Sequence, residues 1–249
     1  MFKKILGSIG IGGAKVDTKL MKTSFFPGEF LEGVVEIQGG QIEQKIDEIY
    51  LSLISNYSIE TDNGKSERTA EIGKFKLLES LVVYANETKS IPFRFALPYD
   101  VPITTSKTKV WIQTGLDIKM AVDPQDRDYL EIQPHPLVSE FLSVVKGLGF
   151  RLRKIEAKNA PSHLRRRLPF AQEFEFSPSS GQYRGRLDEL EAVFFISENQ
   201  VEVILQIDRK GGFFSERLNM DESHVRFTYG RNEVPNLSQL VTNLINQYS

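Results

Sequence analysis

The sequence predicts an all-β protein built from two antiparallel β-sandwich domains, with a short helix between them and a second helix at the C-terminus. Three observations support this fold class. Many short segments alternate apolar and polar residues, which is the pattern of half-buried strands. Turn-forming residues separate these segments, as is typical of sandwiches. Helical spacing of apolar residues is found after residue 134 and again at the C-terminus.

A tight turn introduces the clearest strand. Pro27 fixes φ near the value required at the first central position of a turn, and Gly28 supplies the positive φ that a type II turn needs next. Beyond the turn, residues 31–37 alternate in an extended chain. One side of this chain carries the apolar set Leu31, Gly33, Val35 and Ile37.

The chain up to residue 133 contains further strand patterns at 49–54, 91–97, 110–113 and 130–133. Pro92 has no backbone N–H to donate, so its strand is expected at the edge or the start of a sheet. These strands form the first predicted sandwich, residues 1–133.

Residues 134–150 are predicted to form the interdomain helix. Pro134 and Pro136 interrupt the strand pattern, and apolar residues then recur at helical spacing until Gly147 and Gly149. Strand patterns resume within 151–230, which is predicted to be a second, shorter sandwich. Residues 231–249 are predicted to form an amphipathic C-terminal helix with one apolar stripe.

Composition narrows the functional classes. The chain has 249 residues, a net charge of −2 and no cysteine, so disulfides, thiolate metal sites and cysteine nucleophiles are excluded. Its overall charge gives no reason to expect nucleic acid as a partner. No segment approaches the roughly 20 apolar residues of a membrane span, and glycines interrupt the apolar N-terminus, so a cytoplasmic location is expected.

The first half resembles an arrestin-type N-terminal domain. The resemblance rests on the turn at 26–29, the strand segments at 33–35 and 46–53, and Ile91-Pro92-Phe93-Arg94-Phe95-Ala96-Leu97-Pro98. The whole chain is similar to the bacterial sporulation-control family SpoOM. The residues behind this similarity are Gly10 to Thr18, Leu148 to Leu152, Gln172 to Phe176, Arg184 to Glu191 and Ile207 to Gly212.

The family resemblance implies two arrestin-like sandwiches and a non-enzymatic regulatory scaffold in the cytosol. It also implies action through protein partners, among them division or cytoskeletal machinery, in the control of sporulation or related cell-stage events. No buried Arg–Asp pair of the kind that senses phosphate in eukaryotic arrestins is recognised, so phosphate-triggered activation is not expected.

The C-terminal helix is the best candidate for a partner-binding site, because its apolar stripe must be buried somewhere. Covering the second sandwich and docking to another protein are the two alternatives. A homodimer through edge strands is a further expectation from the symmetry of most assemblies. The candidate partner-binding residues are Leu237, Leu240, Val241, Leu244, Ile245 and Tyr248.

A basic linker is predicted between residues 146 and 167, with eight lysines and arginines against one glutamate, a net charge of +7. These cations either pair with acidic neighbours in the second domain or hold an anionic membrane surface. The second reading makes the protein a peripheral membrane adaptor. Nucleic acid is a third reading, which is less favoured because few aromatic residues are interleaved for stacking. The candidate anionic-surface residues are Arg151, Arg153, Lys154, Arg165, Arg166 and Arg167.

Catalysis has little support in the sequence. A carboxylate-based hydrolase is the remote alternative, and it would use Asp188, Glu189, Glu191 or His224. The three histidines lie on separate segments, so no metal site and no cofactor is expected. The segment at 63–66 ends like a phosphate-binding loop but lacks the required earlier glycine, and is predicted to be a hairpin tip.

Overall fold

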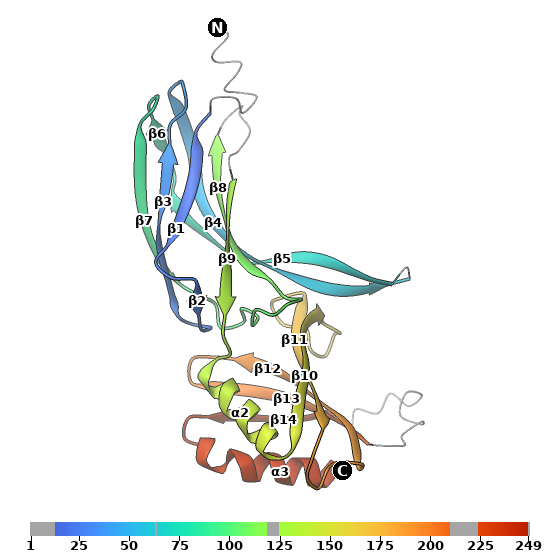
Figure 1. Ribbon diagram of the computed structural model, residues 1–249. Helices are drawn as coiled ribbons and strands as arrows, with labels where there is room; N and C mark the ends of the chain where they lie inside the picture. Colours follow the sequence, from blue (N-terminus) through green and yellow to red (C-terminus); the bar gives the residue numbers. More distant parts are fainter. Residues whose placement is uncertain (1–12, 63, 119–124, 210–223, 249) are drawn as a thin grey trace. The chain divides into compact units, whose positions relative to one another are not determined.

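The computed structural model describes residues 13–62, 64–118, 125–209 and 224–248, and the chain forms two compact units (Figure 1). The first unit takes in residues up to 56 and residues 68–133, and the second takes in 57–67 and 134 onward. Strands predominate in both, and the two α-helices among the described residues lie in the second unit. The predicted all-β fold class with two helices is confirmed.

One sheet of the first unit has three antiparallel strands in the order β1-β3-β7. They are β1 (Lys15–Leu20), β3 (Phe30–Gln38) and β7 (Thr88–Ala96). Pro92 lies in the edge strand β7, so the predicted edge position is confirmed. The turn before β3 is confirmed too, because Gly28 has a φ of +82° and the Glu29 N–H donates to the Phe26 carbonyl at 3.0 Å.

The second sheet of the first unit is built on β4 (Gln44–Thr61), β8 (Val110–Ile118) and β9 (Gln125–Ile132). The strands β5 (Gly64–Leu78) and β6 (Leu81–Val83) pair with β4, and β2 (Ser24–Phe25) pairs with β9. Apolar side chains of β3, β4 and β8 are buried in the first unit, and they include Leu31, Val35, Leu51, Leu53 and Ile112. The hairpin end of β4 and β5, residues 57–67, belongs to the second unit.

Five antiparallel strands form the sheet of the second unit. They run in the order of the sequence: β10 (Phe150–Asn159), β11 (Phe170–Pro178), β12 (Leu187–Ile196), β13 (Gln200–Arg209) and β14 (His224–Gly230). The prediction that the basic stretch at 146–167 is a linker is therefore wrong in one respect. Residues 150–159 of this stretch form strand β10. Ile155 and Ala157 alternate there with charged residues, as in an ordinary half-buried strand.

Two helices cover one face of this sheet. The helix α2 (Pro136–Gly147) packs against β10, β13 and the C-terminal helix α3 (Leu237–Tyr248), which follows the short 3₁₀-helix η3 (Val234–Asn236). The fully buried Phe141 of α2 meets Phe194 at 5.2 Å between ring centroids. The Tyr229 hydroxyl donates to the Leu137 carbonyl at 2.7 Å, which fastens β14 to the start of α2.

The predicted domain limits at residues 133, 150 and 230 stay predictions. The compact second unit nevertheless includes both helices as well as the hairpin end at 57–67. Within the described residues, no helix is long and apolar enough to cross a bilayer. The apolar N-terminus and the predicted turn at 211–212 lie outside the described residues.

Candidate functional site

The outer face of the second unit's sheet, opposite the helices, carries most of the candidate residues. Strand register fixes which residues share this face, because directly paired residues point to the same side. Glu175 lies opposite Lys154 on one neighbour and opposite Glu191 on the other. Glu191 in turn pairs with Gln206, and Gln206 with His224. One row of polar side chains therefore crosses all five strands.

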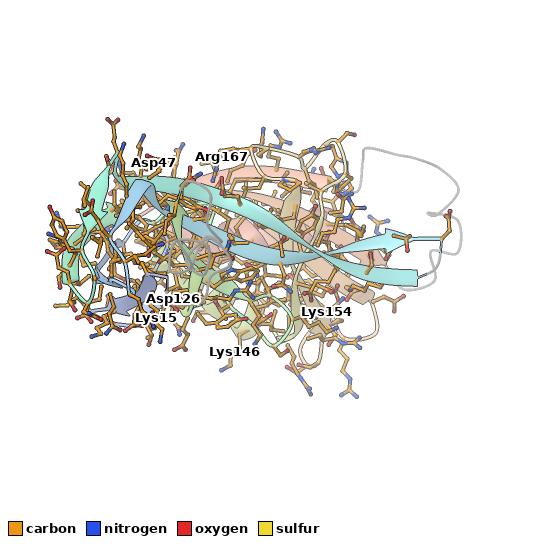
Figure 2. The ribbon with its side chains drawn as sticks, turned by 90° about the horizontal axis from the view of Figure 1, so that it is seen from above. Lys15, Asp47, Asp126, Lys146, Lys154 and Arg167 are labelled. Atoms are coloured by element: carbon orange, nitrogen blue, oxygen red, sulfur yellow. The ribbon has the colours of Figure 1, made fainter. Side chains whose placement is uncertain are left out.

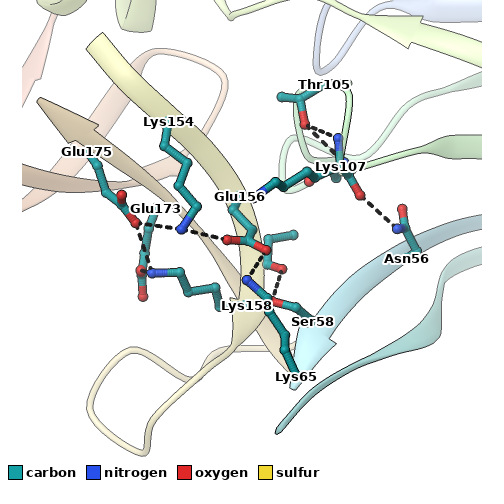
Figure 3. Close-up of polar contacts among 12 residues, drawn as sticks. Asn56, Ser58, Lys65, Thr105, Lys107, Lys154, Glu156, Lys158, Glu173 and Glu175 are labelled. Atoms are coloured by element: carbon teal, nitrogen blue, oxygen red, sulfur yellow. Dashed lines mark hydrogen bonds and ion pairs between the residues drawn. The ribbon is translucent and has the colours of Figure 1, made fainter. Parts of the chain in front are cut away.

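Lysines of β10 form a network of ion pairs with glutamates of β10 and β11 (Figure 3). Lys154 lies 2.8 Å from Glu156 and 3.1 Å from Glu175. Lys158 lies 2.5 Å from Glu173 and 3.1 Å from Glu175. Two cations of the basic stretch, Lys154 and Lys158, are therefore paired with carboxylates of the same sheet.

Glu156 is the most buried member of the network, with 3 % of its surface exposed. It also pairs with Lys65, which comes from the end of the β4–β5 hairpin. Burial alone would raise the pKa of Glu156, but hydrogen bonds from Lys154 and Lys65 lower it to about 2. Glu156 is therefore held as a carboxylate, and its charge joins the hairpin end to β10.

The candidate anionic-surface residues are not gathered into one patch of unpaired cations. Arg151 and Arg153 are exposed on β10, and residues 165–167 are exposed in the loop before β11. Arg166 pairs with Glu202 at 3.2 Å. Figure 2 shows Arg167 in the upper part of the view and Lys146 and Lys154 in the lower part. The anionic-surface site stays a prediction.

The carboxylates proposed for acid–base chemistry do not all lie on the same face of strand β12. Asp188 is exposed beside an irregularity in the pairing of β12 and β13, whereas Glu189 and Glu191 are half-buried. Burial, with the neighbouring Glu173, raises the pKa of Glu191 to about 7. Burial and Glu175 raise the pKa of Glu189 as well.

A pocket of about 210 Å³ opens on this outer face. The loop between β10 and β11 folds over the sheet beside it, and a small apolar cluster fills the space beneath the loop, including Leu164, Val193 and Ile204. The rings of His163 and His224 lie 5.2 Å apart between centroids. The pocket is lined by Pro161, His163, Leu164, Glu173, Glu191, Val193, Ile204, Gln206 and His224.

The structure brings together two of the four residues proposed for the hydrolase alternative, Glu191 and His224, and leaves Asp188 and Glu189 outside the pocket lining. Sequence reasoning missed Glu173, His163 and Gln206 as neighbours of Glu191. The alternation at 173–176 indicated that Glu173 and Glu175 share one face, but only the register of β11 against β12 shows which residues they meet.

Metal binding finds no support within the described part of the chain, where no three histidine, aspartate or glutamate residues are grouped closely enough to hold an ion. The described side chains that line the pocket include no hydroxyl, thiol or amine that could serve as a nucleophile. The expectation that the protein needs no metal or cofactor remains a prediction.

The six candidate partner-binding residues of α3 divide into two groups. Leu237, Val241 and Ile245 are buried against the second unit, whereas Leu240, Leu244 and Tyr248 are half-buried. The C-terminal end is also tied down, because Arg209 Nε donates to the Tyr248 carbonyl at 2.6 Å. The helix is therefore anchored in its own unit, with one flank of its apolar stripe partly open.

Comparisons with known proteins match the chain almost from end to end. The SpoOM protein family matches residues 2–211. The sporulation-control protein spo0M of Bacillus subtilis (strain 168) is 39 % identical over 255 residues, which covers 100 % of this chain and 98 % of that protein. The crystal structure of Spo0M, sporulation control protein, from Bacillus subtilis superposes with a TM-score of 0.87 at 38 % identity, over 96 % of this chain and 100 % of the other.

Proposed function

Since the chain belongs to the SpoOM protein family, we propose that it is a sporulation-control protein that acts by binding other proteins. Membership confirms the family resemblance predicted from the sequence. The regulatory role follows from the relative's name and from the 39 % identity across the full chain. The mode of action, a non-enzymatic scaffold in the cytoplasm with arrestin-like sandwiches, is the proposal.

The single observation that carries this mode of action is the division of the α3 stripe. Leu237, Val241 and Ile245 anchor the helix, so it does not have to leave its unit to present apolar surface. Leu240 and Leu244 lie one turn apart on the adjoining flank and are only half-buried. An apolar strip on a rigid helix is a common contact for a partner protein.

A non-enzymatic role agrees with the ion pairs on the outer face of the second unit's sheet. Glu156, Glu173 and Glu175 are engaged by lysines, which suits a structural network better than acid–base chemistry. The hydrolase alternative requires turnover that depends on Glu189 or Glu191. Purified protein carrying Glu189→Gln or Glu191→Gln is expected to match the wild type in any ester or glycoside hydrolysis assay.

The membrane-adaptor alternative is weakened by the ion pairs of Lys154, Lys158 and Arg166. Cations that already neutralise carboxylates contribute little to an anionic surface. We expect no salt-sensitive co-sedimentation with vesicles containing phosphatidylserine. Binding that falls with added salt and with Arg165→Gln would restore this alternative.

The partners that we propose are other proteins, with division or cytoskeletal machinery as the first candidates. A homodimer through exposed edge strands remains part of the proposal, since β14 ends one sheet and β1 and β7 end another.

Affinity purification from sporulating cells of the native host tests the proposed surface. The bait is the tagged full chain, either wild type or the double variant Leu240→Gln/Leu244→Gln, with Gln239→Ala/Asn243→Ala as the matched control on the exposed side of α3. We expect the wild type and the control to capture specific proteins that the leucine variant does not capture. The circular dichroism spectrum of the leucine variant should match that of the wild type. Equal capture by all three baits would exclude α3 as the contact.

A further inference from the structure

The lining of the pocket on the outer face combines carboxylate and aliphatic side chains. Glu191 and Glu173 supply carboxylates, and Leu164, Val193 and Ile204 supply aliphatic surface. A ligand that matches this lining carries a positive group and a short apolar body. At about 210 Å³ the volume exceeds the roughly 150 Å³ that is enough to hold a benzene molecule.

Glu191 is the carboxylate in this lining that is open to a ligand. Glu173 already pairs with Lys158 at 2.5 Å. Within the described ranges, the Glu191 carboxylate makes neither a hydrogen bond nor an ion pair, although the residue is half-buried. A half-buried carboxylate without a partner is costly, and a bound cation would relieve that cost.

Gln206 lines the same pocket. Its amide nitrogen donates to the Asp208 carboxylate at 3.2 Å, which leaves the amide oxygen as the acceptor beside Glu191. The pocket thus offers oxygen acceptors from Glu191 and Gln206, together with the Glu173 oxygen that is not paired with Lys158. An ammonium group carries three N–H donors and matches three acceptors.

We propose that this pocket binds a primary alkylammonium group, supplied either by a free amine or by a lysine side chain of another protein. The ammonium nitrogen binds between Glu191 and Gln206, and its carbon chain lies against Val193 and Ile204. The inference does not use α3 and goes beyond the proposed partner surface, so either can fail without the other.

Affinity should rise with pH across neutrality. The charged groups that face Glu191 are Glu173 and Glu175 on β11, Lys158 on β10, Glu189 on β12, Asp208 on β13, and the imidazoles of His163 and His224. Burial and Glu173 raise the pKa of Glu191 to about 7, so its ionised fraction rises from about one-tenth at pH 6 to about nine-tenths at pH 8. We expect butylammonium to bind about tenfold more tightly at pH 8 than at pH 6.

The test is an NMR titration of the ¹⁵N-labelled full chain with butylammonium chloride, with butanol as the neutral analogue and Nα-acetyl-lysine methylamide as the side-chain probe. Saturable shifts of the amides at 191–193 and 204–206 are expected with butylammonium and not with butanol. If the lysine derivative binds as well as butylammonium, a protein side chain is the ligand. If only butylammonium binds, the ligand is a free amine, and either result supports the proposal.

The variant Glu191→Gln keeps the shape of the side chain and should weaken butylammonium binding by at least about tenfold. Asp188→Asn, an exposed position on the same strand, is the control and should bind like the wild type. Because the substitution removes a charge that burial disfavours, Glu191→Gln should keep the fold, which its own spectrum checks. The proposal is overturned by absent binding, by equal shifts with butanol, by unchanged affinity in Glu191→Gln, or by tighter binding at pH 6.

Discussion

Replacement of Glu156 by glutamine should destabilise the protein strongly at neutral pH and weakly in acid. The lysines lower the pKa of Glu156 from its usual 4.5 to about 2, a difference that corresponds to about 3 kcal/mol of stability at pH 7. Glu156 is only 3 % exposed, whereas the side chains of Lys65 and Lys154 are 45 % and 31 % exposed, so about 3 kcal/mol is the upper end of the expected loss. Glutamine keeps the shape but leaves Lys65 and Lys154 without this carboxylate.

The pH dependence of the stability loss shows whether Glu156 stabilises the protein through its charge or through its packing. A carboxylate with a lowered pKa contributes its full stability above about pH 4.5 and loses it as the pH falls toward 2. The difference in free energy of unfolding between the wild type and Glu156→Gln should therefore fall from about 3 kcal/mol at pH 7 to about 1 kcal/mol at pH 3. Urea denaturation followed by circular dichroism measures both values.

Glu202→Gln is the matched control, because its partners Arg166 and Arg226 are about half exposed. Its loss should stay within about 1 kcal/mol. A Glu156→Gln loss that is the same at both pH values, or no larger than that of the control, would refute the argument that the buried ion pairs stabilise the second unit.

Three further substitutions test packing, each by urea denaturation. Gly28→Ala should cost about 2 kcal/mol or more, because the residue has a φ of +82° and a Cβ would collide with the Tyr99 ring; an unchanged midpoint would contradict the turn. Phe141→Ala should cost about 3 to 5 kcal/mol by opening a cavity under α2, and a loss below about 1 kcal/mol would mean that the helix is loosely packed. Tyr229→Phe removes the hydrogen bond to Leu137 and should cost about 1 to 2 kcal/mol, whereas no loss would show that this bond does not fasten α2.

The elements that local pattern specifies were predictable from the sequence. Alternation at 31–37 predicted the strand β3, and Leu31, Val35 and Ile37 are indeed fully buried. The apolar stripe predicted α3, whose bounds agree with its first and last apolar residues. In each case the periodicity of neighbouring residues carries the information, and no distant contact is needed.

Features that depend on distant pairing were not predictable. The density of lysine and arginine at 146–167 indicates a linker, whereas residues 150–159 of that stretch form strand β10. Those charges are tolerated because β11 and the hairpin end bring Glu173, Glu175 and Lys65 beside them. The pocket likewise depends on a loop that folds over the sheet, and the sequence carries no local sign of that.

The most direct test of the central claim, a protein-binding regulator without chemistry of its own, is sporulation efficiency in a native-host strain that lacks the gene. The strain is complemented with wild type, with Leu240→Gln/Leu244→Gln, or with Glu189→Gln, a candidate carboxylate outside the pocket lining, at matched protein levels. We predict that the leucine variant fails to restore sporulation control and that the glutamate variant restores it. The opposite result, a functional leucine variant and an inactive glutamate variant, would contradict the account.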